Sequence, residues 1–175
     1  MKQKKVLIGL VIVVAVVVVL PALQSNQSGY IKIDTPNIKT RMSLRGGWWS
    51  EQQVSSGVES VELPARKYRP RHISLAIQKG ESEWVVSGFG PWGELAKINV
   101  KEGQTAVLKP GPPFLVKTNV RRKGQNLSIG LLVIGQAGEH YSAQVRTRRG
   151  SLPAPRLKIV DEGAKVLASD KFKFG

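Results

Sequence analysis

Apolar and polar residues alternate along most of this 175-residue chain, in short stretches separated by turn-forming residues. In residues 72–79, for example, Ile73, Leu75 and Ile77 fall on one face of an extended strand. A period of two is the pattern of a β-strand with one buried face. The alternation predicts strands at residues 29–34, 38–44, 58–63, 72–79, 84–87, 96–101, 114–121, 126–134, 141–147, 157–160 and 166–174.

The strand at 126–134 ends with apolar residues on both faces, which predicts a central strand. Strands that recur about every 8–12 residues are typical of a sandwich or a small barrel. The segment 109–113, Lys-Pro-Gly-Pro-Pro, cannot continue a sheet, because its three prolines lack an N–H group. We therefore expect an all-β protein of two small Ig-like β-sandwich domains, residues 29–109 and 112–175. Residues 50–53, Ser-Glu-Gln-Gln, are expected to form one capped helical turn.

Residues 1–25 are predicted to be a targeting segment outside either domain. Lys2, Lys4 and Lys5 precede residues 6–20, which contain no polar side chain, and this is the order of a signal sequence. Residues 22–24, Ala-Leu-Gln, form a poor cleavage site, so we interpret the segment as an N-terminal hydrophobic helix that anchors the chain in a membrane. A cleaved signal peptide and a buried hydrophobic strand are the alternatives. The rest of the chain would be extracytoplasmic, or secreted or periplasmic after cleavage.

The chain is strongly basic. Its formal net charge is +15, which falls to +12 without the three lysines near the N-terminus. The basic residues cluster beside predicted turns, as Arg66, Lys67, Arg69 and Arg71, as Arg121, Arg122 and Lys123, and as Arg146, Arg148 and Arg149. Such a field attracts polyanions without selecting among them. For an exported protein we expect anionic lipid headgroups or envelope polymers, or a protein partner, and no nucleic acid. A solvated basic surface without a ligand is the alternative.

The first half of the chain resembles the PEGA domain, a short extracytoplasmic β-sandwich. The resemblance rests on residues 29–36 (GYIKIDTP), 42–47 (MSLRGG), 61–68 (VELPARKY) and 98–105 (INVKEGQT). The chain departs from the family pattern at Arg66, where glycine is usual, and by insertions near residues 48–49 and 89–92. The second half is similar, more loosely, to transthyretin-like and carboxypeptidase-regulatory-like sandwiches. These resemblances imply an accessory or binding domain at the cell surface, without catalytic residues.

Tryptophans provide a second group of candidate binding residues. Trp48, Trp49 and Trp92 lie in or beside glycine-rich loops, and Arg45 precedes the first pair. Exposed indoles next to basic residues can stack on sugar rings, so these four residues are a candidate carbohydrate site, with Trp48 and Trp92 as the expected exposed pair. The alternative is that the indoles fill the core of a small sandwich.

The sequence contains no recognisable catalytic or metal-binding constellation. There is no cysteine. His72 and His140 lie far apart and lack partners at metal-ligand spacing. Residues 88–93 match G-x-G-x-x-G but contain Pro91 and precede a predicted strand, whereas a dinucleotide site needs a helix there. We expect no metal, cofactor or catalytic residue, and a non-enzymatic role in envelope binding, adhesion or scaffolding. A carbohydrate-binding module and an unrecognised enzyme are the alternatives.

Overall fold

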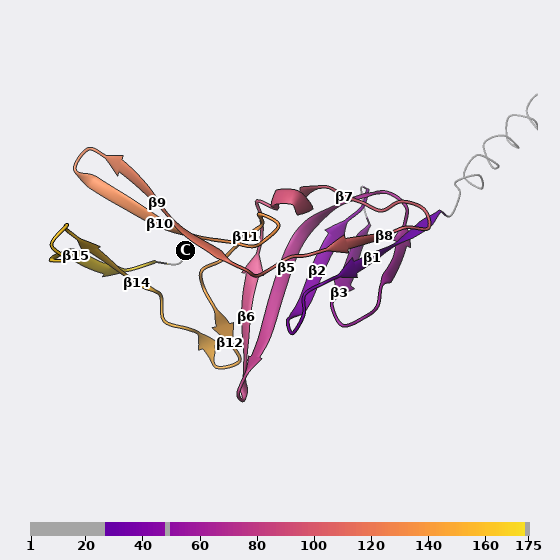
Figure 1. The fold of residues 1–175 in the computed structure, drawn as a ribbon, viewed down its shortest axis with the longest axis horizontal. Helices are drawn as coiled ribbons and strands as arrows, with labels where there is room; N and C mark the ends of the chain where they lie inside the picture. The colour runs from indigo at the N-terminus through magenta and orange to yellow at the C-terminus, as the bar shows by residue number, and fades with distance from the viewer. Residues whose placement is uncertain (1–26, 48–49, 174–175) are drawn as a thin grey trace, which may run out of the picture.

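The computed structural model describes residues 27–47 and 50–173, and these residues form an all-β structure with one short 3-10 turn (Figure 1). No α-helix occurs within these two ranges, which confirms the predicted all-β class. The elements are β1 (Ser28–Ile33), β2 (Lys39–Arg45), β3 (Glu51–Ser55), β4 (Val61–Pro64), β5 (Lys67–Lys79), β6 (Ser82–Gly88), η1 (Gly93–Ala96), β7 (Ile98–Asn99), β8 (Thr105–Leu108), β9 (Leu115–Lys123), β10 (Asn126–Ile134), β11 (His140–Tyr141), β12 (Arg146–Thr147), β13 (Gly150–Ser151), β14 (Arg156–Val160) and β15 (Val166–Lys171).

The core lies between two sheets that come mainly from the first half of the chain. One sheet has the order β4-β1-β8, and the other has the order β13-β12-β6-β5-β2-β3 with β7 beside β5. Alternate residues of β1, β2 and β5 are buried in one apolar cluster, as the period of two predicts. Its largest fully buried apolar side chains are Tyr68, Ile31, Met42, Leu44 and Ile73.

The second half contributes little to this core and instead forms two extended hairpins. Among the described residues after 112, Ala137 and Tyr141 are the ones that join the buried cluster. β9 and β10 pair antiparallel over their full length, and β14 pairs with β15. Both hairpins project from the same side of the core (Figure 1). β10 lies between β9 and β11, which confirms its prediction as a central strand.

The prediction of a helical turn at residues 50–53 was wrong, because residues 51–53 belong to strand β3. β3 pairs with β2 so that Val54 lies opposite Met42, and both side chains are almost completely buried. A single helical turn is unstable by itself, because nucleation fixes several dihedral angles for one hydrogen bond. Burial of Val54 therefore outweighs the local capping pattern.

β5 begins at Lys67, five residues before the predicted start at 72. The added residues include Pro70, although proline cannot donate a hydrogen bond to a neighbouring strand. In the structure the register against β2 shifts between Ser43 and Leu44, next to Pro70. This β-bulge tolerates the proline and lets the alternation continue back to Tyr68.

Four other predicted strands are shorter than expected. Residues 58–63 and 166–174 correspond to the shorter strands β4 and β15. Residues 96–101 yield only β7, because η1 places Leu95 in the core and leaves Ala96 exposed, although Ile98 and Val100 are buried as the alternation predicts. Residues 141–147 divide into β11, which pairs with β10, and β12, which pairs with β6.

The predicted N-terminal hydrophobic helix lies outside the described residues. Among the residues that the structure does describe, no helix has the length and apolar character that crossing a bilayer requires.

Candidate functional site

A buried carboxylate fixes the point where the second half of the chain meets the core. Glu139 is fully buried, and its Oε1 atom accepts hydrogen bonds from the backbone N–H of Gly111 at 2.5 Å and from the Tyr141 hydroxyl at 2.8 Å. Burial raises the pKa of the Tyr141 phenol, and the adjacent Glu139 carboxylate raises it further. The bond between Gly111 and Glu139 therefore joins the segment before β9 to the turn that follows β10.

The same turn is held against the loop around η1 by backbone contacts. Glu94 donates its N–H to the Ala137 carbonyl at 2.8 Å, and the N–H of His140 donates to the Pro91 carbonyl at 2.8 Å. Gly93 has a positive φ of 54° and lies so close to Ala137 and Gly138 that a Cβ atom would overlap their backbone. The base of the β9–β10 hairpin is therefore fixed, whereas the rest of the hairpin projects outward.

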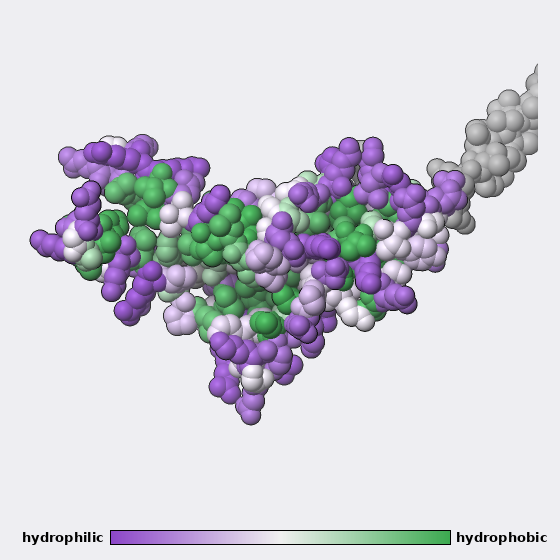
Figure 2. Space-filling model, viewed as in Figure 1, coloured by the Kyte–Doolittle hydropathy of each residue, from purple (hydrophilic) through white to green (hydrophobic). Residues whose placement is uncertain are grey.

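A cleft of about 940 Å³ opens between the two hairpins. Leu131 of β10 and Ile159 of β14 are among the apolar residues that line its opposite walls. Figure 2 shows apolar surface between the hairpins and polar residues on their outer sides. The principal apolar lining residues are Leu127, Ile129, Leu131, Leu157, Ile159 and Phe172.

The outer face of the long sheet carries a group of arginines that the sequence places in separate segments. Arg45, at the end of β2, lies directly opposite Arg69 of β5, and both are exposed. Arg41 is on the same face of β2, since Met42 and Leu44 point into the core. Arg71 is exposed where the register against β2 shifts. We call the four residues Arg41, Arg45, Arg69 and Arg71 the arginine face.

The local backbone around this face is held in place by packing. Gly46 is buried, and a Cβ atom there would overlap the Tyr68 ring. Arg66 donates from its Nη1 atom to the Gly46 carbonyl at 3.2 Å, so this member of the predicted cluster supports the loop. Glu51 lies opposite Arg45 on β3, and its carboxylate accepts a hydrogen bond from Ser43.

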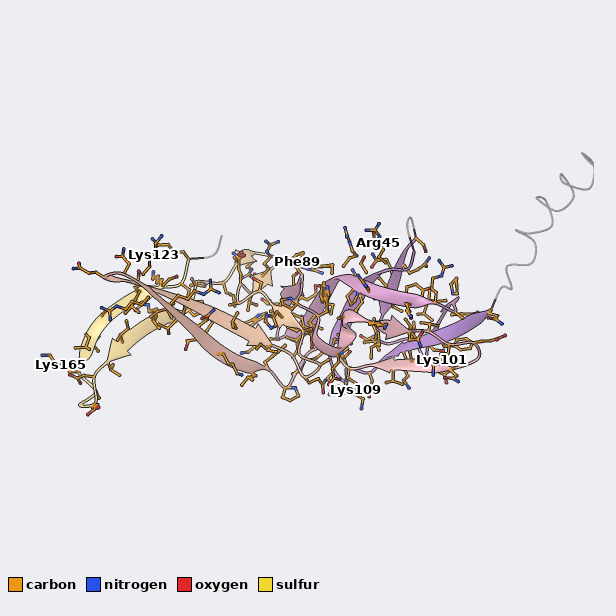
Figure 3. The ribbon with its side chains drawn as sticks, turned by 90° about the horizontal axis from the view of Figure 1, so that it is seen from above. Arg45, Phe89, Lys101, Lys109, Lys123 and Lys165 are labelled. Atoms are coloured by element: carbon orange, nitrogen blue, oxygen red, sulfur yellow. The ribbon has the colours of Figure 1, made fainter. Side chains whose placement is uncertain are left out.

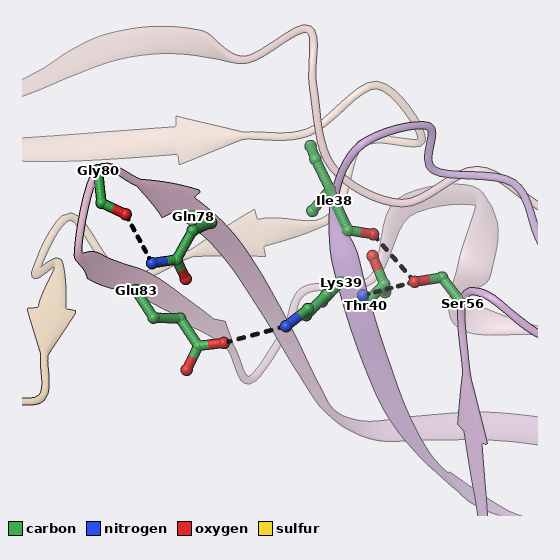
Figure 4. Close-up of polar contacts among 7 residues, drawn as sticks. All are labelled: Ile38, Lys39, Thr40, Ser56, Gln78, Gly80 and Glu83. Atoms are coloured by element: carbon green, nitrogen blue, oxygen red, sulfur yellow. Dashed lines mark hydrogen bonds and ion pairs between the residues drawn. The ribbon is translucent and has the colours of Figure 1, made fainter.

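Positive charge at the other end of the same sheet is partly compensated. Lys39 of β2 forms an ion pair with Glu83 of β6 at 3.9 Å (Figure 4). In the same region Ser56 accepts a hydrogen bond from the Thr40 N–H at 2.8 Å and donates one to the Ile38 carbonyl at 2.9 Å. Arg45 and Arg69 lie opposite each other toward the other end of β2.

The three basic clusters predicted from sequence do not form one patch. Arg121, Arg122 and Lys123 lie at the tip of the β9–β10 hairpin, whereas Lys67, Arg69 and Arg71 lie on β5. Figure 3 shows Lys123 and Arg45 on separate parts of the molecule. In the third cluster, Arg146 lies on β12, and Arg148 and Arg149 lie in the turn between β12 and β13.

The tryptophans that the structure describes have roles in packing. Trp92, expected to be exposed, is half-buried and packs against the core. Trp84 is also half-buried, and the Lys79 ammonium lies 4.6 Å from the centroid of its ring. Trp48 and Trp49 lie outside the described residues. The alternative role of core filling therefore suits Trp92 better than an exposed sugar platform does.

Neither histidine is among the residues that line the cleft. His72 packs against Phe89 with ring centroids 4.9 Å apart, and Phe89 is 71% exposed. His140 begins β11 and is half-buried. Within residues 27–47 and 50–173, no three His, Cys, Asp or Glu side chains are grouped closely enough to hold a metal ion.

Comparison with protein-family models, with curated proteins and with solved structures finds no match to this chain. The resemblance of the first half to the PEGA domain therefore stays a prediction.

Sequence reasoning missed two features of these sites. The sequence does not predict that Glu139 is a buried junction, because its hydrogen-bond partner Gly111 is 28 residues away. The cleft was missed because a strand with an apolar face is expected to be covered, and the sequence does not indicate how far two hairpins lie apart.

Proposed function

We propose that this chain is a non-enzymatic, extracytoplasmic binding protein that attaches to anionic groups of the cell envelope through the arginine face. The observation that supports this most is the direct opposition of Arg45 and Arg69 on neighbouring strands. Like charges directly opposite each other destabilise a sheet. Glu51 lies on the other side of Arg45, on β3. A bound anion would offset the remaining repulsion between the two arginines, since the planar guanidinium group binds carboxylates and phosphates with two parallel donors.

The proposal includes the finer organisation that the sequence predicts. The first half would be a PEGA-like sandwich anchored through residues 1–25, and the two hairpins would supply the layers of a second, open sandwich. Anchoring would hold the arginine face close to the anionic polymers and lipids of the envelope. The shared chemistry of these ligands is a repeated phosphate or carboxylate group.

Carbohydrate binding through tryptophans is less well supported than anion binding. Of the three tryptophans assigned to that site, Trp92 is half-buried and packs against the core, so only part of its side chain is exposed. The arginines of the proposed face, in contrast, are exposed.

Binding to immobilised anions tests the proposal. The full chain, held in phosphatidylcholine nanodiscs, is passed over alginate, over polyphosphate and over vesicles containing phosphatidylglycerol. We expect binding that is lost in 1 M salt, where electrostatic interactions are screened beyond about 3 Å. Arg45→Gln with Arg69→Gln should weaken binding at least about tenfold, because charge-assisted hydrogen bonds contribute about 1.5–3 kcal/mol each.

The matched control removes the same charge from the hairpin tip, as Arg121→Gln with Arg122→Gln. This variant should bind within about twofold of the wild type if recognition is local, since the total charge is the same in both variants. Equal losses in the two variants would contradict the proposal and indicate general charge attraction. The surface that binds most tightly distinguishes a polymer from a lipid headgroup.

A further inference from the structure

β9 is an edge strand with two chemically different faces. Its even-numbered residues share a face with Leu127, Ile129 and Leu131 of β10, which line the cleft. Val116 and Val120 extend that apolar face, Thr118 lies between them, and Arg122 ends it at the hairpin tip. Its odd-numbered residues lie on the opposite face, where Lys117, Arg121 and Lys123 are basic. In the middle of this nine-residue strand, Val116 and Val120 therefore lie on one face and Lys117 and Arg121 on the other.

The outer edge of β9 has no neighbouring strand within the described part of the chain, because its sheet has the order β11-β10-β9. An edge strand presents a row of N–H and C=O groups that another strand can bind. Its apolar residues are also accessible, since Val116 is 60% exposed and Val120 is 57% exposed. A free edge with accessible side chains can bind an extended peptide as an additional strand. In such binding, backbone hydrogen bonds provide affinity and alternate side chains provide specificity.

We propose that the free edge of β9 binds an extended segment of a partner protein in which apolar and acidic residues alternate. Added to this edge, such a segment places its apolar side chains beside Val116 and Val120, on the face that continues into the cleft. Its acidic side chains then lie on the other face, beside Lys117 and Arg121. Both faces of the partner strand match β9 in a single register, because neighbouring side chains of a strand point to opposite faces.

A second copy of the chain and a membrane surface fit this edge less well than an acidic partner strand does. A second copy paired through its own β9 brings Lys117, Arg121 and Lys123 of the two copies onto neighbouring strands, and like charges at such positions repel. A flat anionic membrane contacts the outer basic face but cannot enter the cleft, whose apolar walls belong to two hairpins. The proposal concerns a different surface from the arginine face and stands independently of it.

The test uses three designed peptides and the full chain in phosphatidylcholine nanodiscs. The first peptide alternates valine and glutamate over nine residues, the length of β9. The second has lysine in place of glutamate, and the third has the composition of the first with its valines in one block. We expect the alternating acidic peptide to bind at least about tenfold more tightly than either of the others, as measured by fluorescence anisotropy.

Charge reversal on β9 gives the sharpest comparison. Lys117→Glu with Arg121→Glu should abolish binding of the acidic peptide and create binding of the lysine peptide, and this reversed preference also shows that the variant remains folded. The matched control, Arg156→Glu with Lys158→Glu, makes the same charge change on β14 and should leave peptide binding within about twofold of the wild type.

Four results would overturn the proposal. The first is equal loss of binding in the β9 and β14 variants. The second is that the wild type binds all three peptides equally, whatever their order or charge. The third is a doubled mass of the wild type in light scattering that Lys117→Glu with Arg121→Glu removes, which would assign the edge to a second copy. The fourth is binding to phosphatidylglycerol vesicles without binding to the acidic peptide, which would assign the edge to a membrane.

Discussion

Among single residues, the most informative is Glu139 with its buried carboxylate. Its Oε1 atom accepts two hydrogen bonds, whereas its Oε2 atom is buried and has no hydrogen-bond partner among the described residues. A buried polar atom without a partner carries a free-energy cost, so the two bonds at Oε1 must compensate for it. Glu139 therefore acts as a junction between the segment at Gly111 and the turn after β10.

Glu139→Ala should lower the free energy of unfolding by about 1–3 kcal/mol, because it leaves the buried N–H of Gly111 without its acceptor. Glu139→Gln should cost less, since the amide retains an acceptor oxygen. Urea denaturation measures both values. Glu162→Ala, at an exposed position in the β14–β15 turn, is the control and should change stability by less than about 0.5 kcal/mol. If Glu139→Ala leaves the stability of the wild type unchanged, the junction contributes nothing.

The raised pKa of Tyr141 predicts that the protein loses stability in alkaline solution. Burial, and then the Glu139 carboxylate, make the folded state hold the phenolic proton more tightly than the unfolded state does. Above pH about 10 the unfolded tyrosine releases its proton while the folded one retains it, so the free energy of unfolding falls as pH rises.

Tyr141→Phe removes one of the groups responsible for this alkaline loss. The variant should be less stable near neutral pH, by about 1 kcal/mol, because it lacks the bond to Glu139. Its stability should then decline less steeply above pH about 10, although Tyr68, whose pKa is also raised by burial, retains part of the effect. Urea midpoints measured from neutral to alkaline pH give both slopes, and parallel slopes would contradict this role of Tyr141.

Among the strands, alternation in the sequence predicts an element well where one face is buried. β1, β2 and β10 lie within one residue of their predicted bounds. Prediction failed where a tertiary contact outweighs a local pattern, as in β3, where pairing of Val54 with Met42 replaces a capped turn. The early start of β5 was also missed, because the β-bulge next to Pro70 depends on the neighbouring strand and is invisible in the sequence.

Apolar residues in the two halves of the chain should differ sharply in their effect on stability. Ile73 is fully buried in the core, whereas Leu127 of β10 is 57% exposed. Ile73→Ala should cost about 2–5 kcal/mol, from lost burial and the cavity left behind. Leu127→Ala should cost less than about 1 kcal/mol, because little apolar surface is buried there. Comparable costs in thermal or urea denaturation would mean that the hairpins have a core of their own.

Across the molecule as a whole, the arginine face and the exposed apolar surface lie in different places. The sequence predicts the basic clusters, but the opposition of Arg45 and Arg69 depends on the register of β2 against β5 and cannot be obtained from their separation in the chain. The cleft depends likewise on how two hairpins project from a shared base. Spatial juxtaposition of distant strands is thus the part of both sites that sequence alone does not supply.

A well-packed core that carries two open hairpins underlies both proposed binding surfaces. Hydrogen–deuterium exchange of the full chain, followed segment by segment, examines this division directly. Amides of β1, β2 and β5 should exchange slowest, at the rate of global unfolding, and those of β9, β14 and β15 should exchange much faster through local opening. Protection of the hairpins equal to that of β2 and β5 would show that no such division exists.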